Sequence, residues 1–352
     1  MRIGVLTLPL HLNYGGILQA FALQKVLMSM GGEVFLIDTV WWEKRLPFYK
    51  LTFWKFHHRS KNTRSFIKKN IKTIEVTDYN KLKRIAPDAL VVGSDQVWRP
   101  MYFGDVKDAF LNFASDWPIK RVAYAASFGT DEWEYSDEQT RKCAELIKQF
   151  DAVSVREEEA RWLCREHFHQ DTKVMLDPTL LLTASDYRHL IKKSKDVVIT
   201  KSSLCVYFLD ETEDKNRLVY YVAEENKKLP VVRLSSPSGG SFWQVQPSVE
   251  HWIQSIADSR MVVTDSFHAC VFSILFHKPF IVYGNRLRGM ARFNTLLNLF
   301  GLQNLLLLSS SEFTSAKCSS IDWEKIEICL EMKRAESINF LKSALYDSRG
   351  NE

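Results

Sequence analysis

The sequence predicts an α/β protein built from two doubly wound domains, each with a mostly parallel sheet between two layers of helices. Short apolar segments of strand length alternate with helical patterns along most of the 352 residues, and this alternation is typical of parallel sheets covered on both faces. The alternation restarts after a polar stretch at residues 192–201. The restart indicates a second domain of the same kind.

The strands of the first domain are predicted from short apolar runs, and helical patterns at 17–30 and 137–150 lie between several of them. The basic, aromatic-rich segment 41–72 interrupts this order and is interpreted as an insertion. The predicted strands are 2–8, 33–37, 89–93, 121–126, 152–155 and 173–176.

The second domain repeats the pattern. Pro230 and Pro279 each stand at the start of an apolar run, where a missing N–H does little harm to a strand. We divide the chain into an N-terminal domain at 1–190, a C-terminal domain at 200–320 and an amphipathic terminal helix within 321–352. The predicted elements of the second domain are strands at 204–209, 231–234, 261–264 and 280–283 and helices at 212–228, 249–258, 267–276 and 290–300. Ligands of such sheets bind beyond the carboxyl ends of the strands, which predicts a site in the cleft between the domains.

Composition bounds the class of protein. Apolar residues make up 46% and charged residues 25% of the chain, as in ordinary globular proteins. No apolar run is long enough to span a bilayer, and the N-terminus is interpreted as a strand rather than a signal peptide. The six cysteines lie far apart, as expected of reduced thiols in the cytoplasm. Cys164, His167 and His169 approach a metal-ligand spacing, but no second ligand cluster accompanies them, so we predict no metal site.

Charge is concentrated in one segment. Residues 41–72 hold ten Lys and Arg against one Glu, a net charge of +9, so that the rest of a chain of net charge +5 carries −4. Eight aromatic residues are interleaved with these cations. Such a pattern suits an anionic membrane surface, a cover over an anionic substrate, or a solvated insertion that packs its aromatics on its own domain. Nucleic acid is not expected as a partner, because no nucleic-acid motif accompanies the patch.

The first motif follows the first strand. Asn13, Tyr14, Gly15 and Gly16 lead directly into a helix, where glycines let the backbone approach a ligand and the helix N-terminus favours an anion or a hydroxyl. A tight turn capped by Asn13 explains the same residues equally well.

Polar residues also follow three later strands. Ser94 and Asp95 end one strand, with Trp98 in position to stack on a sugar; Ser127 ends the next, and Arg156 the one after. Asp95 suits hydrogen bonding to sugar hydroxyls, and an arginine at a strand end suits a carboxylate or a phosphate. The alternatives are a helix cap with a core Trp98, and a surface salt bridge between Arg156 and the glutamates that follow it.

The segment around His268 is the most informative. A predicted strand delivers Asp265 and Ser266 as caps to a helix with His268 in its first turn. A helix N-terminus makes a protonated imidazole a stronger acid, which suits protonation of a carbon, although a structural histidine is the usual alternative. No serine-hydrolase elbow is present.

Three arginines follow a later strand. Arg286, Arg288 and Arg292 lie near a predicted helix start, where they suit the binding of an anion. A solvated basic face is the alternative.

In order, these segments resemble the polysaccharide pyruvyl transferase family, in the branch common in capsule and exopolysaccharide gene clusters. Each segment is modest, but the collinear set spans residues 3 to about 302. The matching segments are N-Y-G-G-I-L-Q-A at 13–20, V-G-S-D-Q-V-W at 92–98, A-S-F-G at 126–129, S-V-R-E at 154–157, D-P-T-L at 177–180, T-D-S-F-H at 264–268 and K-P-F at 278–280.

The resemblance implies a bacterial enzyme with two Rossmann-like domains facing across a cleft, as in the GT-B glycosyltransferases. It implies phosphoenolpyruvate as the donor substrate, no cofactor, and a hexose-containing saccharide as acceptor, often carried on a lipid pyrophosphate. The expected product is a pyruvate ketal, made in the cytoplasm or at the inner face of the membrane.

Roles carry over to matching positions. His268 is the expected general acid and Asp95 a base, and Arg156 binds the donor, with Arg288, Arg292 and Ser266 beside it. The resemblance departs at Ser266, where many members have arginine, so that Arg286, Arg288 or Arg292 is expected to replace it. Acceptor or backbone contacts are assigned to Asn13, Tyr14, Gly15, Gly16, Ser94, Trp98 and Ser127. Two other functions stay open: a nucleotide-sugar glycosyltransferase and a non-catalytic saccharide-binding member.

Overall fold

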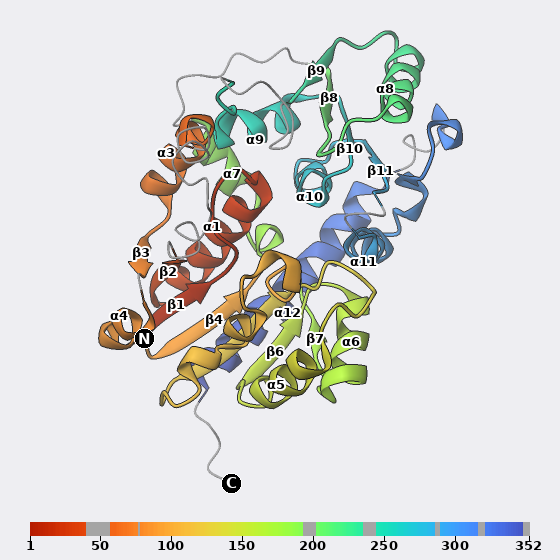
Figure 1. The fold of residues 1–352 in the computed structure, drawn as a ribbon. Helices are drawn as coiled ribbons and strands as arrows, with labels where there is room; N and C mark the ends of the chain where they lie inside the picture. Colours follow the sequence, from red (N-terminus) through yellow and green to blue (C-terminus); the bar gives the residue numbers. More distant parts are fainter. Residues whose placement is uncertain are drawn as a thin grey trace.

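The structure is a computed structural model that contains two separate parallel sheets, one in each half of the chain (Figure 1). Helices pack around both sheets, so the predicted α/β class with two Rossmann-like domains is confirmed. The residues that the structure describes are 1–39, 57–76, 78–192, 202–234, 244–285, 289–315 and 321–347.

The first sheet has seven parallel strands in the order β3-β2-β1-β4-β5-β6-β7. Its central strands are buried along almost their whole length, as expected of apolar runs covered by helices on both faces. The strands are β1 (Arg2–Leu6), β2 (Glu33–Thr39), β3 (Thr73–Val76), β4 (Ala89–Gly93), β5 (Lys120–Ala126), β6 (Ala152–Val155) and β7 (Lys173–Val174).

The second sheet has five parallel strands in the order β12-β11-β10-β8-β9. It is shorter, and its edge strand β9 is partly exposed. The strands are β8 (Leu204–Tyr207), β9 (Val231–Arg233), β10 (Met261–Thr264), β11 (Phe280–Tyr283) and β12 (Leu306–Leu307).

In each sheet the strand order reverses once, between β1 and β4 in the first and between β8 and β10 in the second. Such switch points are where doubly wound sheets bind ligands. The two switch points face each other, because a Cβ added to Gly15, which follows β1, would overlap the imidazole of His268, which follows β10. The residues of both reversals therefore form one site.

Helices cover both sheets and connect the strands. The first, α1, is buried on nearly all sides, which explains why apolar residues surround its axis. The α-helices are α1 (Tyr14–Ser29), α3 (Lys61–Asn70), α4 (Tyr79–Ile85), α5 (Asp137–Ile147), α6 (Glu158–Phe168), α7 (Ala184–Lys192), α8 (Glu213–Glu225), α9 (Val249–Asp258), α10 (Phe267–Leu275), α11 (Ala291–Phe300) and α12 (Trp323–Tyr346).

The two domains are packed against each other. One apolar cluster runs without interruption from α1 and the first sheet to α9, α10 and the second sheet. The terminal helix α12 crosses from the second domain back to the first (Figure 1). Its Arg334 donates to the carbonyl of Leu180 at 2.9 Å, and its Ser337 hydroxyl accepts from Leu176 N at 3.2 Å. These contacts attach α12 to the first domain.

The predicted strands are present, most within one or two residues of their predicted ends, and the predicted terminal helix is α12. Two short strands, β3 and β12, were not predicted because a run of two to four residues carries little periodicity. The predicted insertion 41–72 is described only from residue 57, and most of the predicted domain junction lies outside the described residues. No helix within the described ranges is long and apolar enough to cross a membrane.

Candidate active site

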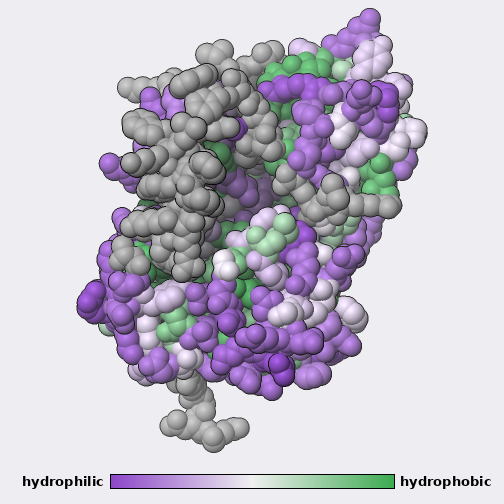
Figure 2. Space-filling view, in the orientation of Figure 1, coloured by the Kyte–Doolittle hydropathy of each residue, from purple (hydrophilic) through white to green (hydrophobic). Residues whose placement is uncertain are grey.

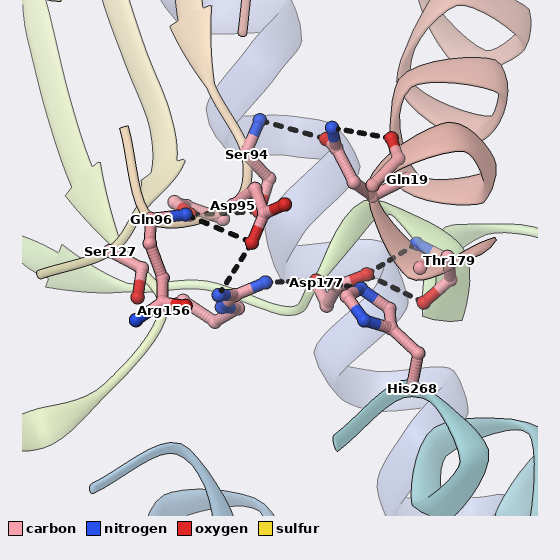
Figure 3. Close-up of polar contacts among 12 residues, drawn as sticks. Gln19, Ser94, Asp95, Gln96, Ser127, Arg156, Asp177, Thr179 and His268 are labelled. Atoms are coloured by element: carbon pink, nitrogen blue, oxygen red, sulfur yellow. Dashed lines mark hydrogen bonds and ion pairs between the residues drawn. The ribbon is translucent and has the colours of Figure 1, made fainter. Parts of the chain in front are cut away.

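His268 lies in the first turn of α10, where the second sheet meets the first. Ser266 caps this helix by accepting from Ala269 N at 3.5 Å, and its own N–H donates to the Thr264 hydroxyl at 3.0 Å. The imidazole is 5% exposed, and its Nε2 lies 3.5 Å from Oδ2 of Asp177, a residue of the first domain (Figure 3). The His268–Asp177 pair therefore crosses the domain boundary.

Asp177 is the anion that organises the site. Its Oδ2 accepts from Arg156 Nη1 at 2.7 Å, and its Oδ1 accepts from the backbone and hydroxyl of Thr179. Burial would raise the pKa of Asp177, but His268, Arg156 and Thr179 outweigh burial and hold the pKa well below its ordinary value. Asp177 is thus a permanent carboxylate beside His268.

Arg156 is surrounded by carboxylates. Besides the bond to Asp177, its Nη2 lies 3.7 Å from Asp95 Oδ1 and its Nε lies 3.9 Å from Glu157 Oε2. Burial lowers the pKa of Arg156, but the three carboxylates outweigh burial and raise the pKa above its ordinary value. The guanidinium also lies over the ring of Phe267, 4.9 Å from the ring centroid.

Arg292, from α11 of the second domain, approaches the same aromatic ring. Its guanidinium lies 5.8 Å from the Phe267 centroid. Burial, reinforced by the neighbouring Arg156, lowers the pKa of Arg292 to about 10, so it remains a cation at neutral pH. Arg286 and Arg288, the other predicted arginines of this region, lie outside the described residues.

A cavity of about 360 Å³ opens beside these groups, within the size range of small-molecule sites. Its walls come from both domains and from α12, and cations and carboxylates are mixed among apolar residues. His268 is not among the residues that line the cavity, but its partner Asp177 is. The polar and aromatic lining residues are Arg156, Glu158, Glu159, Asp177, Phe267, Arg292, Thr295, Asn298 and Lys333. The face shown in Figure 2 is hollowed between the two halves of the molecule.

Asp95 is at the edge of the site, but Ser94 is structural. Ser94 is fully buried; its N–H donates to Gln19 Oε1 at 3.0 Å and its hydroxyl donates to the carbonyl of Ala125 at 2.9 Å. These bonds tie the end of β4 to α1 and β5. They hold Asp95 so that its Oδ1 faces Arg156 and its Oδ2 would lie 3.3 Å from a Cβ at Gly16.

Ser127 is bound to Glu157. The Glu157 Oε1 accepts from the Ser127 hydroxyl at 2.7 Å and from the backbone N–H groups of Phe128 and Gly129 at 3.1 and 3.0 Å. One carboxylate oxygen thus orders the whole turn after β5, and the side chain of Ser127 is committed to this network rather than to a ligand.

Three of the predicted acceptor contacts have structural roles. Asn13 caps α1 by accepting from Gly15 N at 3.0 Å. The Tyr14 hydroxyl donates to the carbonyl of Pro247 at 2.7 Å, and its ring stacks on Trp252. Trp98 is fully buried with its ring stacked on Phe110 at 4.8 Å, so the core alternative describes Trp98 and its ring is not available to a sugar.

Two central residues were not among the predicted site residues. Asp177 begins the segment D-P-T-L of the family resemblance without an assigned role, and Glu157 is predicted only as a salt-bridge partner of Arg156. The available signal was a carboxylate after each of two adjacent strands, β6 and β7. The Cys164 spacing does not gather metal ligands: no cluster of three such residues occurs in the part of the chain that is described.

Asp265 does not reach the cavity. It accepts from Leu209 N at 2.6 Å and from Lys215 Nζ at 2.7 Å, and both partners belong to the second domain. This buried pair closes the switch point of the second sheet, between β8 and β10. Asp265 therefore holds the strand ends that present His268.

The fold and this site define a two-domain α/β protein of the GT-B class, with its polar site at the domain boundary. Structural neighbours agree. The UDP-GlcNAc 2-epimerase from Neisseria meningitidis bound to UDP-GlcNAc has a TM-score of 0.55 at 10% identity, over 99% of this chain and 100% of that one. A glycosyltransferase from Rickettsia africae has a TM-score of 0.52 at 10% identity, over 99% of both chains. At such identities the likeness establishes the fold alone.

The sequence supplies the family. The model of the polysaccharide pyruvyl transferase family matches residues 13–286, well over half of the chain. The protein therefore belongs to the polysaccharide pyruvyl transferases, and the predicted family is confirmed. Curated protein sequences give no match to this chain. The match ends before Arg292 and Lys333, so part of the cavity wall lies beyond the matched region.

Gly15→Ala is expected to disrupt the site, because the added Cβ would overlap the His268 imidazole. Overpacking of this kind costs about 1–3 kcal/mol, which thermal unfolding would detect. Gly104→Ala is the matched control, since a Cβ there meets nothing within 4 Å; its effect should stay within about 0.5 kcal/mol. Equal melting temperatures for the two variants would contradict the packing described.

Asp177→Asn is expected to lower the unfolding free energy by about 3–5 kcal/mol at neutral pH, because it leaves Arg156 buried without its partner. Since folding lowers the Asp177 pKa, this contribution is present above about pH 4 and is lost as the pH falls below the unfolded value. Urea unfolding from pH 7 downward should therefore show the two proteins converging in acid. Asp171→Asn, in an exposed pair, is the control; a constant gap at all pH values would refute the assignment.

Proposed function

We propose that this chain transfers pyruvate from phosphoenolpyruvate to a hexose of a saccharide acceptor, forming a ketal. The observation that carries the proposal is the pairing of His268 with the ionised Asp177, next to two buried arginines on a cavity of about 360 Å³. The reaction needs an acid for a carbon atom and positive charge for a donor with a carboxylate and a phosphate. At the domain boundary His268 would supply the acid, and the buried arginines would supply the positive charge.

Arg292 would bind the charged groups of the donor. Arg156 is largely neutralised by its three carboxylates, whereas burial and Arg156 lower the pKa of Arg292. An anion beside Arg292 would therefore offset both its desolvation and its repulsion from Arg156. Ser266 directly precedes Phe267 of the cavity wall and carries no charge, so the proposal places the donor-binding cation at Arg292.

In the proposed reaction, two hydroxyls of one sugar add in turn to the same carbon of the donor. His268 gives its proton to the methylene carbon of the donor as general acid, and Asp177 stabilises the imidazolium before this transfer. A sugar hydroxyl adds to the adjacent carbon and yields its proton to Asp95. The C–O bond to phosphate then breaks and phosphate leaves. A second hydroxyl of the same sugar adds to the same carbon, closes the ketal and gives its proton to the now neutral His268.

A nucleotide-sugar glycosyltransferase is the second candidate, favoured by neighbours such as the epimerase bound to UDP-GlcNAc. The second domain argues against it. Helix α8 carries Glu213 and Asp214 in its first turn, and Asp214 accepts from both the N–H and the hydroxyl of Ser310. A carboxylate already occupies the positive end of this helix, where a diphosphate would be expected to bind.

A peripheral contact with an anionic membrane is the proposed route to a lipid-linked acceptor. Helix α3 packs Phe66 on Phe21 at 5.9 Å and turns Lys61, Lys68 and Lys69 outward. A cationic outer face over an apolar inner face suits an anionic lipid surface.

Phosphoenolpyruvate is expected to raise the melting temperature, by the equivalent of about 2.7 kcal/mol at 100 times its dissociation constant. UDP-GlcNAc should leave the melting temperature unchanged. Arg292→Gln should lose the shift, because it removes the cation, whereas His268→Asn should keep the shift and lose turnover by a factor of about 10²–10⁴. Arg165→Gln, at an exposed pair, is the control. A shift with UDP-GlcNAc alone would move the protein to the glycosyltransferases.

Vesicles that contain phosphatidylserine should bind the protein, and binding should weaken as salt rises from about 50 to about 500 mM, because exposed charges are then screened. Replacing Lys61, Lys68 and Lys69 by Gln should reduce cosedimentation with the vesicles. The same change at Lys148, Lys173 and Lys342, which are exposed on other elements, should leave it intact. Salt-insensitive binding, or none, would refute the membrane contact.

A further inference from the structure

One edge of Arg156 is not used by the scheme above. Nη1 binds Asp177, but Nε and Nη2 have no hydrogen-bond partner among the residues that the structure describes. These two N–H groups lie side by side, on an edge of the guanidinium that binds two oxygens at once. The side chain is only 2% exposed, and buried donors without partners are costly. The edge is therefore built for oxygens that the protein itself does not supply.

Two carboxylates flank this edge without bonding to it. Asp95 Oδ1 lies 3.7 Å from Nη2 and Glu157 Oε2 lies 3.9 Å from Nε, both beyond hydrogen-bond distance. Glu157 is fully buried, and its Oε2 has no hydrogen-bond partner within the described ranges, although its Oε1 has three. Glu157 thus offers an acceptor toward Arg156 in addition to its structural bonds.

Gln96 completes the arrangement, which we call the polar ring: Asp95, Gln96, Gly129, Arg156 and Glu157. The N–H of Gln96 donates to Asp95 Oδ1 at 2.9 Å, and its side-chain Nε2 lies against Gly129, whose N–H donates to Glu157. Gln96 is 9% exposed, and its Nε2 has no hydrogen-bond partner in the described part of the chain. Figure 3 shows the Asp95 carboxylate in contact with both Gln96 and Arg156.

Charge decides which ligand suits the polar ring. Three carboxylates, Asp95, Glu157 and Asp177, face two guanidiniums, Arg156 and Arg292. A further anion on the Nε–Nη2 edge would share that edge with two carboxylates, which lie 3.7 and 3.9 Å from its nitrogens. A neutral group that both donates and accepts hydrogen bonds fits instead, and a hydroxyl does both.

We propose that the polar ring binds two neighbouring hydroxyls of the saccharide acceptor. Asp95 and Glu157 each accept a hydrogen bond from one hydroxyl, while the Arg156 edge and Gln96 donate to the hydroxyl oxygens. The proposal rests on the proposed function, which joins two hydroxyls of one sugar to the same carbon. It makes Gln96 and Glu157 specificity-determining residues and separates the acceptor from the anion at Arg292.

The second domain closes the polar ring. Gly129 has a φ of +72° and Gly289 a φ of +85°, and a Cβ on Gly289 would overlap the carbonyl oxygen of Gly129. Two backbones approach here as only glycines allow. A diol in the ring would therefore be enclosed by both domains, with His268 on the same domain as Gly289.

Gln96→Leu tests the proposal, because leucine keeps the approximate size and removes the donor. Gln24→Leu is the matched control: Gln24 is also buried, but both ends of its amide bond Lys72. Titration calorimetry would compare methyl gluco-, galacto- and mannopyranosides with their monodeoxy forms. Thermal shift with phosphoenolpyruvate would be measured on the same proteins.

We expect at least one hexoside to bind the unchanged protein, and its affinity to fall at least tenfold when either bridged hydroxyl is missing. The hexoside affinity of Gln96→Leu should also fall at least tenfold, whereas that of Gln24→Leu should not change. Both variants should keep the melting-temperature shift with phosphoenolpyruvate. Equal hexoside affinity in Gln96→Leu, or no hexoside binding at all, would overturn the diol site. Loss of the phosphoenolpyruvate shift in Gln96→Leu would assign the ring to the donor, and absence of that shift in the unchanged protein would instead refute the proposed function.

Discussion

The site depends on the contacts that the Asp177 carboxylate makes with both domains. Its Oδ2 lies 2.7 Å from Arg156 on the first domain and 3.5 Å from His268 on the second. The Arg156 cation would be costly to bury alone, and the Asp177 anion makes its burial tolerable. Because the pair spans two domains, its geometry is only as rigid as their contact. The apolar cluster that runs through both sheets and the strap formed by α12 supply that rigidity.

Facing switch points explain why the polar residues gather here. Each doubly wound sheet leaves a crevice where its strand order reverses, and each reversal is closed by side chains of its own domain. Gln19 and Ser94 join the ends of β1 and β4 in the first sheet, while Asp265 joins β8 and β10 in the second. These hydrogen bonds within each domain join the strand ends on either side of the crevice. What remains for chemistry is the surface where one switch point touches the other, at Gly15 and His268.

Much of the fold followed from the sequence, because strands buried on both faces are continuous apolar runs. The site followed only in part. His268 and Arg156 could be predicted as polar residues at strand ends. Asp177 also follows a predicted strand, 173–176, but the sequence does not show that this carboxylate lies beside both Arg156 and a histidine of the other domain. The role of Trp98 could not be predicted either. A tryptophan beside a predicted site has the same sequence pattern whether its ring stacks on a ligand or, as here, on Phe110. Only tertiary contacts distinguish the two.

The departure at Ser266 has a physical explanation in the helix that follows. Ser266 caps α10 and accepts from Ala269 N, a role that an arginine cannot take and that stabilises a helix by about 1 kcal/mol. The capped helix positions Phe267, and two guanidiniums approach its ring. Arg156 lies 4.9 Å and Arg292 lies 5.8 Å from the ring centroid. A second cation thus reaches the cavity from α11 rather than from position 266. Arg292 lies beyond the region matched by the family model, so this cation comes from a part of the chain that the family pattern does not include.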